Sequence, residues 1–262
     1  MRFTVCEMND STTLFQEDWG QLIRHVAKEK SECVLLPEMP FSPWFAAGQN
    51  YDEAQWRRAV ASHAEWLERL PGLGASIVLG TRAIEKSGKR LNEAFLWSRE
   101  RGYHAMHHKF YLPNEQGVWE ANWGHPGDGK FTTAVLNGAK FGYMICSELW
   151  FFEHARQYAS EGVHILLAPR KTEKRTLDKW LVGGQAAAIV SGAFCLSSNS
   201  VTPTCEFGGR GWIISPNGVV LGITDSRQPF LTMDLDLRVA EKAKGTYPRN
   251  VAVPQESRRL PI

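Results

Sequence analysis

The chain has 262 residues and a formal net charge of +2; 43% of its residues are hydrophobic and 22% are charged. This length suffices for one large α/β domain, and the composition is ordinary for a globular protein. So small a net charge gives no reason to expect nucleic acid or an anionic membrane as a partner. No apolar run reaches the roughly 20 residues of a membrane helix, and residues 1–5 lead directly into a strand pattern instead of resembling a signal peptide.

The pattern along the chain alternates between strands and helices. Apolar residues recur at helical spacing over residues 12–29, 56–70 and 176–191, and Pro71-Gly72 ends the second of these helices. The turn signals Asn137-Gly138 and Ser215-Pro216-Asn217-Gly218 predict β-hairpins. Short apolar runs predict strands at residues 3–6, 33–36, 77–80, 94–97, 103–105, 132–136, 141–145, 165–168, 193–198, 212–214, 219–221 and 230–235.

This order predicts an α/β fold, either a mixed sheet or a pair of sheets with helices outside. We see no low-complexity linker, so we expect a single domain over residues 1–262. The tail from about residue 239 is polar and contains three prolines. We expect it to form an extended arm that reaches a partner subunit.

The five cysteines form an odd number, and no two of them have C-x-x-C spacing. We therefore expect reduced thiols and a cytoplasmic location, not a disulfide framework. Cys6, Cys33 and Cys195 lie in apolar runs, where buried packing is expected. Cys146 differs, because it ends a strand-like run and is followed by Ser147, an acid and an aromatic stretch, a pattern typical of a nucleophile presented on a turn.

Two other segments place a charged residue directly after a strand-like run. Glu38 follows Leu35-Leu36-Pro37, and Lys109 follows residues 103–108 and precedes Phe110-Tyr111-Leu112-Pro113. With Cys146 they offer a carboxylate, an ammonium and a thiol. That set is sufficient for acyl transfer to water.

These three segments, in this order, resemble the Glu-Lys-Cys motifs of the carbon–nitrogen hydrolase (nitrilase-related) superfamily, amidase / N-carbamoyl amidohydrolase branch. The resemblance extends from residue 3 to about residue 235. It also matches Glu120, ahead of Pro126-Gly127, to a further glutamate of the family. Glu148 and Glu153 match the acids that follow the family's cysteine.

The resemblance implies a four-layer αββα sandwich and the hydrolysis of a non-peptide C–N bond through a thioester, with release of ammonia. It makes Cys146 the nucleophile and Glu38 the general base and acid. Lys109 would hold the oxyanion, and Glu120 would hold the substrate nitrogen and orient Lys109. No metal or organic cofactor is expected. The partners expected are a small-molecule amide or carbamoyl substrate and a second copy of the chain, giving a homodimer or a higher even oligomer with contacts near residues 151–160 and Trp180.

The chain departs from the family at two positions. Many members carry arginine where this chain has Trp150, so an arginine clamp for a carboxylate is absent at that position. Members that hydrolyse nitriles usually have tryptophan directly after the cysteine, where this chain has Ser147. Ser147 and the short chain favour an amide or carbamoyl substrate over a nitrile. A nitrilase, or a binding protein with the same fold and no turnover, remains an alternative.

Substrate contacts are expected from aromatic loops and from one basic residue. Phe41, Trp44 and Trp150 lie in loops that should border the site, and ten tryptophans in all leave pocket lining and core or interface packing as equal alternatives. Arg170 or Lys171, just beyond a strand end, is a candidate to meet an anionic group of the substrate.

Several other features have simpler interpretations. Glu115 is the alternative to Glu120. Residues 124–130 resemble a P-loop but lack the Ser/Thr and the helix that must follow, so we expect a turn. His104, His107 and His108 lie on a strand without a further ligand cluster, and we expect no metal site there.

Overall fold

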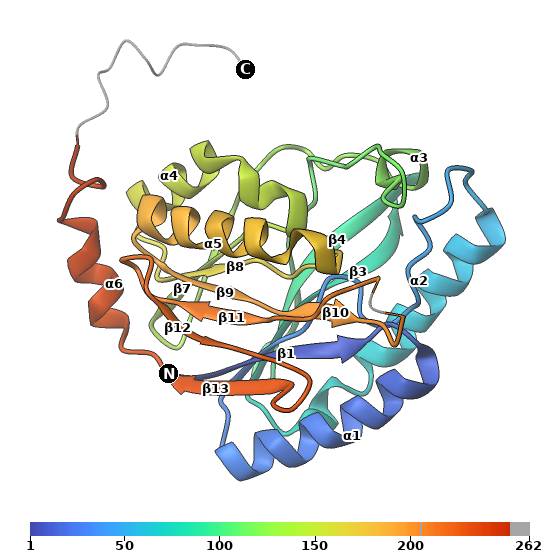
Figure 1. Ribbon diagram of the computed structural model, residues 1–262, viewed down its shortest axis with the longest axis horizontal. Helices are drawn as coiled ribbons and strands as arrows, with labels where there is room; N and C mark the ends of the chain where they lie inside the picture. The colour runs from blue at the N-terminus through green and yellow to red at the C-terminus, as the bar shows by residue number, and fades with distance from the viewer. Residues whose placement is uncertain (205, 252–262) are drawn as a thin grey trace.

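The computed structural model describes residues 1–204 and 206–251. Its two β-sheets lie face to face, and helices cover the outer side of each (Figure 1). The predicted four-layer αββα sandwich of two mixed sheets is therefore confirmed.

The first sheet has the strand order β10-β1-β2-β3-β4-β5, and β13 pairs with β1 on the same edge as β10, next to it along the strand. Strands β10, β1, β2 and β3 are parallel, whereas β13, β4 and β5 pair antiparallel with their neighbours. The strands are β1 (Arg2–Asn9), β2 (Cys33–Leu35), β3 (Ile77–Lys86), β4 (Lys89–Ser98), β5 (Gly102–His108), β10 (Asn199–Val201) and β13 (Phe230–Asp234).

The second sheet has the order β12-β11-β9-β8-β7-β6. Its centre, β7-β8-β9, is parallel, and hairpins add β6, β11 and β12 antiparallel. The strands are β6 (Thr133–Leu136), β7 (Ala139–Tyr143), β8 (Ile165–Leu167), β9 (Phe194–Ser197), β11 (Trp212–Ile214) and β12 (Val220–Ile223). Asn137 and Gly138 of the β6–β7 turn both have positive φ, as their sequence predicts.

Two pairs of long helices form the outer layers. Helices α1 (Thr12–Glu29) and α2 (Glu53–Leu67) cover the first sheet, and α4 (Phe152–Ser160) and α5 (Leu177–Ser191) cover the second (Figure 1). The shorter helices are η1 (Leu70–Leu73), α3 (Glu120–Trp123), η2 (Cys146–Trp150), η3 (Lys174–Thr176) and α6 (Leu237–Lys244).

The strand sequences explain this layering, because the central strands are buried on both faces. On β2, Cys33 and Leu35 point into the core between the sheets, while Val34 points into the core beneath α1. On β8, Ile165 and Leu167 belong to the core between the sheets, and the residue between them faces α4 and α5. Because successive side chains of a strand point to opposite faces, these apolar runs supply both the core between the sheets and the cores beneath the outer helices.

One tyrosine joins the two sheets by hydrogen bonds. The buried hydroxyl of Tyr143 on β7 donates to the carbonyl oxygen of Phe95 on β4 (2.6 Å) and accepts from the amide of Gly80 on β3 (3.1 Å). These bonds fix the second sheet against the first only three residues before Cys146.

Most predicted elements are confirmed, with three differences. β3 extends to Lys86 and forms a hairpin with β4, which the sequence analysis missed, and β10 was not expected. The expected extended arm is wrong at its start. There, Asp236 caps α6, and Lys244 donates to the carbonyl oxygens of Val163 and Gly192 (2.6 and 2.7 Å). Residues 252–262 of the arm, and Cys205, lie outside the described residues.

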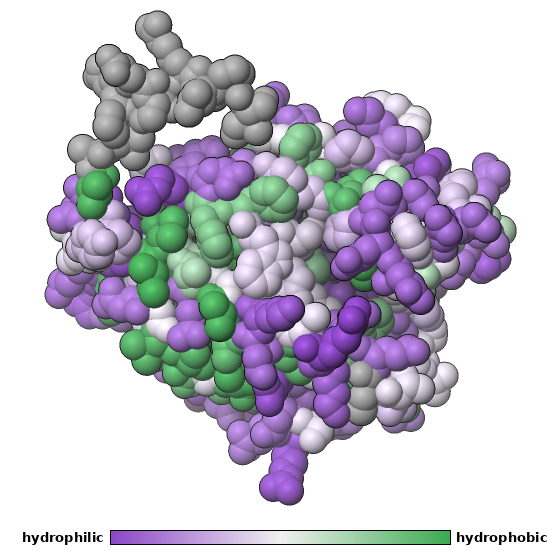
Figure 2. Space-filling model, turned by 45° about the horizontal axis from the view of Figure 1, so that its top comes forward, coloured by the Kyte–Doolittle hydropathy of each residue, from purple (hydrophilic) through white to green (hydrophobic). Residues whose placement is uncertain are grey.

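The outer surface formed by α4 and α5 carries exposed apolar side chains. Figure 2 brings this side of the molecule forward and shows hydrophobic groups among hydrophilic ones. Trp150 and Val182, beside and within α5, are 41% and 62% exposed. In the part of the chain that the structure describes, no helix combines the length and apolar character needed to cross a membrane.

Candidate active site

Three loops, each following a strand, bring Glu38, Lys109 and Cys146 into the interior. Glu38 lies three residues beyond β2, Lys109 directly follows β5, and Cys146 opens η2 after β7. The backbone amides of Lys109 and Cys146 donate to the carbonyl oxygens of Asn92 and Pro169 (2.9 and 3.0 Å). The side chains of Glu38 and Lys109 are fully buried, and Cys146 is 6% exposed.

A buried cluster of charges surrounds Lys109. Its Nζ donates to Glu38 Oε1 (2.8 Å) and to both oxygens of Glu120 (2.8 and 2.7 Å). Asn92 Nδ2 on β4 also donates to Glu38 Oε1 (2.8 Å). The second oxygen, Glu38 Oε2, has no hydrogen-bond partner among the described residues. The carboxylate is thus held through one oxygen while the other remains available to take a proton.

Burial and charge determine the protonation of these groups. Burial would lower the pKa of Lys109, but the Glu120 and Glu38 carboxylates raise it well above its usual value, so Lys109 is an ammonium ion. Burial raises the pKa of Glu120 to about 7, against the effect of Lys109 and with a contribution from Glu38.

The thiol of Cys146 is protonated at rest. Burial, and then the Glu38 charge, raise its pKa, and Lys109 only partly offsets them. The thiol must therefore lose its proton to a neighbouring base when it reacts. The φ of Cys146 is +46°, a left-handed conformation that is rare for a residue with a side chain and is typical of functional turns.

Of the two candidates for the second glutamate, the structure places Glu120 against Lys109. Glu115 lies in a β-bridge with Val118 and is exposed. Residues 124–130 form a loop without helix, as expected, and the histidines of β5 belong to no group of potential metal ligands within residues 1–204 and 206–251.

The four predicted substrate-binding residues are not gathered at this centre. Phe41 is buried in the core beneath α1, where it stacks on Trp66 (centroids 5.6 Å apart). Trp150 packs on the outer surface against Trp180 and Gly183 of α5. For both residues the structure shows packing, and contact with substrate stays a prediction.

Arg170 and Lys171 are also held by the protein. Arg170 is fully buried, donates to Ser197 Oγ (2.7 Å), Thr172 Oγ1 (2.8 Å) and the Arg210 carbonyl oxygen (2.8 Å), and stacks on Trp212. Lys171 pairs with Asp10. Neither cation is left without a partner of its own, although Arg170 stays a predicted substrate contact.

Trp44 lines the two cavities next to the charged cluster. Together with Phe45 and Trp123 it lines an open groove of about 870 Å³ and also a small cavity of about 20 Å³, which Asn92 and Glu120 line as well. The larger groove therefore adjoins the charged cluster through these aromatic rings. The indole Nε1 of Trp44 donates to the Gly117 carbonyl oxygen (3.2 Å), which fixes the ring at this border.

The sequence analysis missed one residue that contacts the candidate machinery directly. Asn92 lies in a strand segment between Leu91 and Glu93, and its side chain is 5% exposed. A buried amide in a predicted strand signals a hydrogen-bonding role. Nothing in the spacing indicates that its partner is Glu38, 54 residues earlier.

Known proteins resemble this chain in sequence and in fold. The model of the carbon-nitrogen hydrolase family matches residues 9–244. A 2-oxoglutaramate amidase of Bacillus subtilis is 26% identical over 225 residues, which cover 83% of each chain. The structure of a carbon-nitrogen hydrolase from Helicobacter pylori G27 superposes with a TM-score of 0.83 and 19% identity, covering 95% of this chain and 94% of that one.

A mutant of the amidase from Nesterenkonia sp. AN1 has the acetamide moiety of fluoroacetamide covalently added at its active-site cysteine. It superposes with a TM-score of 0.76 and 16% identity, covering 92% of each chain. At these identities, the structural likenesses show the fold.

Proposed function

Since this chain belongs to the carbon–nitrogen hydrolase family, we propose that it is a cysteine-dependent amidase. Its substrate would be a small linear amide or an N-carbamoyl compound, and ammonia would be released through a thioester. The observation that carries the proposal is the convergence of Glu38, Lys109 and Glu120 in one buried cluster beside the strained turn at Cys146.

In the first half of the reaction, the thiol proton of Cys146 passes to Glu38 Oε2, the oxygen without a partner. The thiolate attacks the carbonyl carbon, and the carbonyl oxygen becomes an oxyanion. The Lys109 ammonium and a backbone N–H just after Cys146 stabilise this charge, which a dry and preorganised site does efficiently.

In the second half, Glu38 gives its proton to the substrate nitrogen, the C–N bond breaks and ammonia leaves. A thioester joins the acyl group to Cys146. Glu38 then takes a proton from water, the resulting hydroxide adds to the thioester, and the sulfur leaves as a thiolate that recovers a proton. The carboxylate that acts as base is therefore also the acid, and no group needs to move between the two halves.

Glu120 would have two tasks in this scheme. Both of its oxygens bind the Lys109 ammonium, which fixes the cation for the oxyanion. It also lines the small cavity next to the aromatic groove. From there the carboxylate could accept a hydrogen bond from the substrate's amide nitrogen.

Two features favour an amide over a nitrile. Ser147 stands where nitrile-hydrolysing members usually have tryptophan, and the named relative from Bacillus subtilis is an amidase. The carbamoyl alternative keeps the same mechanism, since it also releases ammonia from a carbonyl carbon. We further propose a cytoplasmic homodimer that pairs through α4 and α5, where Trp150 and Val182 are exposed.

The test is ammonia release from a panel of linear amides, N-carbamoyl compounds and nitriles. Cys146→Ala should abolish release, and Cys33→Ala, at another buried cysteine, serves as the matched control. Activity on nitriles alone would favour a nitrilase. Full activity of Cys146→Ala on any substrate would refute the cysteine mechanism.

A further inference from the structure

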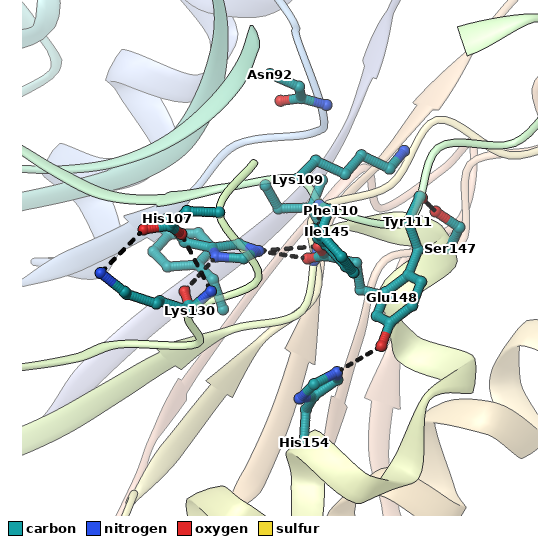
Figure 3. A network of polar contacts seen from close by, with 12 residues as sticks. Asn92, His107, Lys109, Phe110, Tyr111, Lys130, Ile145, Ser147, Glu148 and His154 are labelled. Atoms are coloured by element: carbon teal, nitrogen blue, oxygen red, sulfur yellow. Dashed lines mark hydrogen bonds and ion pairs between the residues drawn. The ribbon is translucent and has the colours of Figure 1, made fainter. Parts of the chain in front are cut away.

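A further buried acid, Glu148, connects the two loops that carry Lys109 and Cys146. Its Oε1 accepts the backbone N–H of Phe110 (2.7 Å), the residue after the lysine. Its Oε2 accepts the backbone N–H of Ile145 (2.8 Å), the residue before the cysteine. Figure 3 shows this carboxylate between the two chain segments, which come from different sheets.

His107 completes the contacts of this carboxylate. Its Nε2 lies 2.9 Å from both oxygens of Glu148, and its Nδ1 lies 3.0 Å from the Lys130 carbonyl oxygen (Figure 3). Both ring nitrogens face oxygen atoms, and all of these contacts become hydrogen bonds when both nitrogens donate, as in an imidazolium. Burial would lower the pKa of His107, but the charge and hydrogen bond of Glu148 raise it overall.

This pair is deeply buried and does not belong to the reacting cluster. Both side chains are 0% exposed. Neither makes a hydrogen bond to Glu38, Lys109 or Glu120 within the described part of the chain. A charged pair placed without solvent behind a site is costly unless every hydrogen bond is made. Here the pair has three partners outside itself, the N–H groups of Phe110 and Ile145 and the carbonyl oxygen of Lys130.

The same two loops are joined at a second point. The hydroxyl of Ser147 donates to the carbonyl oxygen of Tyr111 (2.6 Å), and the Tyr111 ring stacks on Phe151 with centroids 3.5 Å apart. The left-handed turn at Cys146 is thus fixed on both sides, at Ile145 and at Ser147. Such a turn persists only when its surroundings hold it.

We propose that Glu148 and His107 are positioning residues that set the nucleophile turn against the lysine loop, without touching the substrate. This inference rests on the proposed function. Glu148 fixes the backbone beside Lys109 and the backbone beside Cys146 through one rigid carboxylate. His107 orients that carboxylate and balances its charge.

Glu148→Gln tests the first residue, because glutamine has the same shape but can accept only through one atom. The NH2 group of the glutamine would face either a backbone N–H or the His107 N–H, and two donors cannot form a hydrogen bond. We expect kcat to fall about 100-fold, as for a small misplacement of reacting groups, while KM stays within about threefold. Unchanged kcat, or a rise in KM alone, would overturn the proposal.

His107→Gln and His107→Leu separate positioning from packing. Glutamine can keep a donor near Nε2, so its kcat should lie between those of wild type and His107→Leu. His104→Leu, at an exposed histidine of the same strand, is the matched control and should retain wild-type kcat. If Glu148→Gln fails to fold, this series decides, and equal kcat for wild type and His107→Leu would overturn the proposal.

A substrate-free measurement distinguishes failure of this inference from failure of the proposed function. The rate at which iodoacetamide alkylates Cys146 should be about tenfold lower in Glu148→Gln than in wild type, because the thiol is no longer aligned with its base. If wild type hydrolyses nothing in the panel but this difference is found, the proposed function fails and the positioning role stands. Equal alkylation rates would overturn the positioning role.

Discussion

The substitution Asn92→Ala probes how the candidate base is held. Asn92 Nδ2 donates to Glu38 Oε1 at 2.8 Å, the oxygen that also receives the Lys109 ammonium. The backbone carbonyl of Asn92 separately accepts the amide of Lys109 (2.9 Å), and this bond survives the substitution. The change therefore removes one orienting contact of Glu38 and leaves the strand pairing intact.

The expected size follows from the charge on the acceptor. A hydrogen bond to a charged group contributes about 1.5–3 kcal/mol. If that orientation is needed in the transition state, kcat/KM falls by about 10- to 150-fold, since about 1.4 kcal/mol corresponds to a factor of ten. The free energy of unfolding should fall by at most about the same 1.5–3 kcal/mol, because the substitution also removes the buried Asn92 Oδ1, which lacks a partner among the described residues.

The assay is ammonia release from the best substrate of the panel, combined with urea unfolding of the same protein. Asn122→Ala is the control, because Asn122 is a half-buried asparagine of α3 whose side chain donates to the carbonyl oxygen of Gln49 and makes no hydrogen bond to Glu38. It should keep wild-type kcat/KM within about twofold, as surface substitutions commonly do. A kcat/KM of Asn92→Ala within threefold of wild type would refute this account of Glu38.

Three further predictions concern stability and pH. Burial opposes ionisation of Glu93, but hydrogen bonds from His108 and Tyr103 and the contacts with Arg82 lower its pKa to about 2. Glu93→Gln should therefore lower the free energy of unfolding in urea by about 3 kcal/mol at pH 7, and this loss should shrink as the pH falls from about 4.5 through 2. A loss that does not depend on pH would contradict this prediction. Tyr143→Phe removes two buried hydrogen bonds between the sheets and should lower the free energy of unfolding by about 1–3 kcal/mol in the same assay. An unchanged value would show that the bridge between the sheets contributes nothing. Because burial raises the pKa of Glu120 to about 7, its carboxylate gains a proton as the pH falls through 7, and wild-type kcat/KM should decline below that pH. Any activity left in Glu120→Gln should not show this decline. Identical pH profiles of kcat/KM would show that Glu120 is not the group responsible.

The sequence was sufficient to predict which charged groups meet. Glu38, Lys109 and Cys146 each follow a strand-like run, and the loops after β2, β5 and β7 bring them together in the layered α/β fold. Their order along the chain also matched a known family. The contact between Glu120 and Lys109 follows from the same resemblance and is present at 2.7–2.8 Å.

The sequence was less informative where tertiary contacts override local pattern. The second half of β3, with Arg82 and Lys86, is polar, yet it pairs with β4 across a tight turn at Ser87 and Gly88, both with positive φ. Near the end of the described chain, α6 is short, and only its cap at Asp236 signals a helix.

Aromatic residues were the hardest to assign. Phe41 and Trp150 are close in sequence to Glu38 and Cys146, but Phe41 lies in the core and Trp150 on the outer face. Pocket lining and packing use the same residue types, so no sequence pattern separates them. The pairing of Glu148 with His107, 41 residues earlier, likewise appears only in three dimensions.

The most direct test of the central claim is mass spectrometry of the enzyme quenched during turnover of an amide substrate. The account predicts an acyl group attached to the peptide that contains Cys146, absent from Cys146→Ala and lost as the substrate is consumed. Turnover with no acyl adduct on that peptide, together with full hydrolysis by Cys146→Ala, would contradict it.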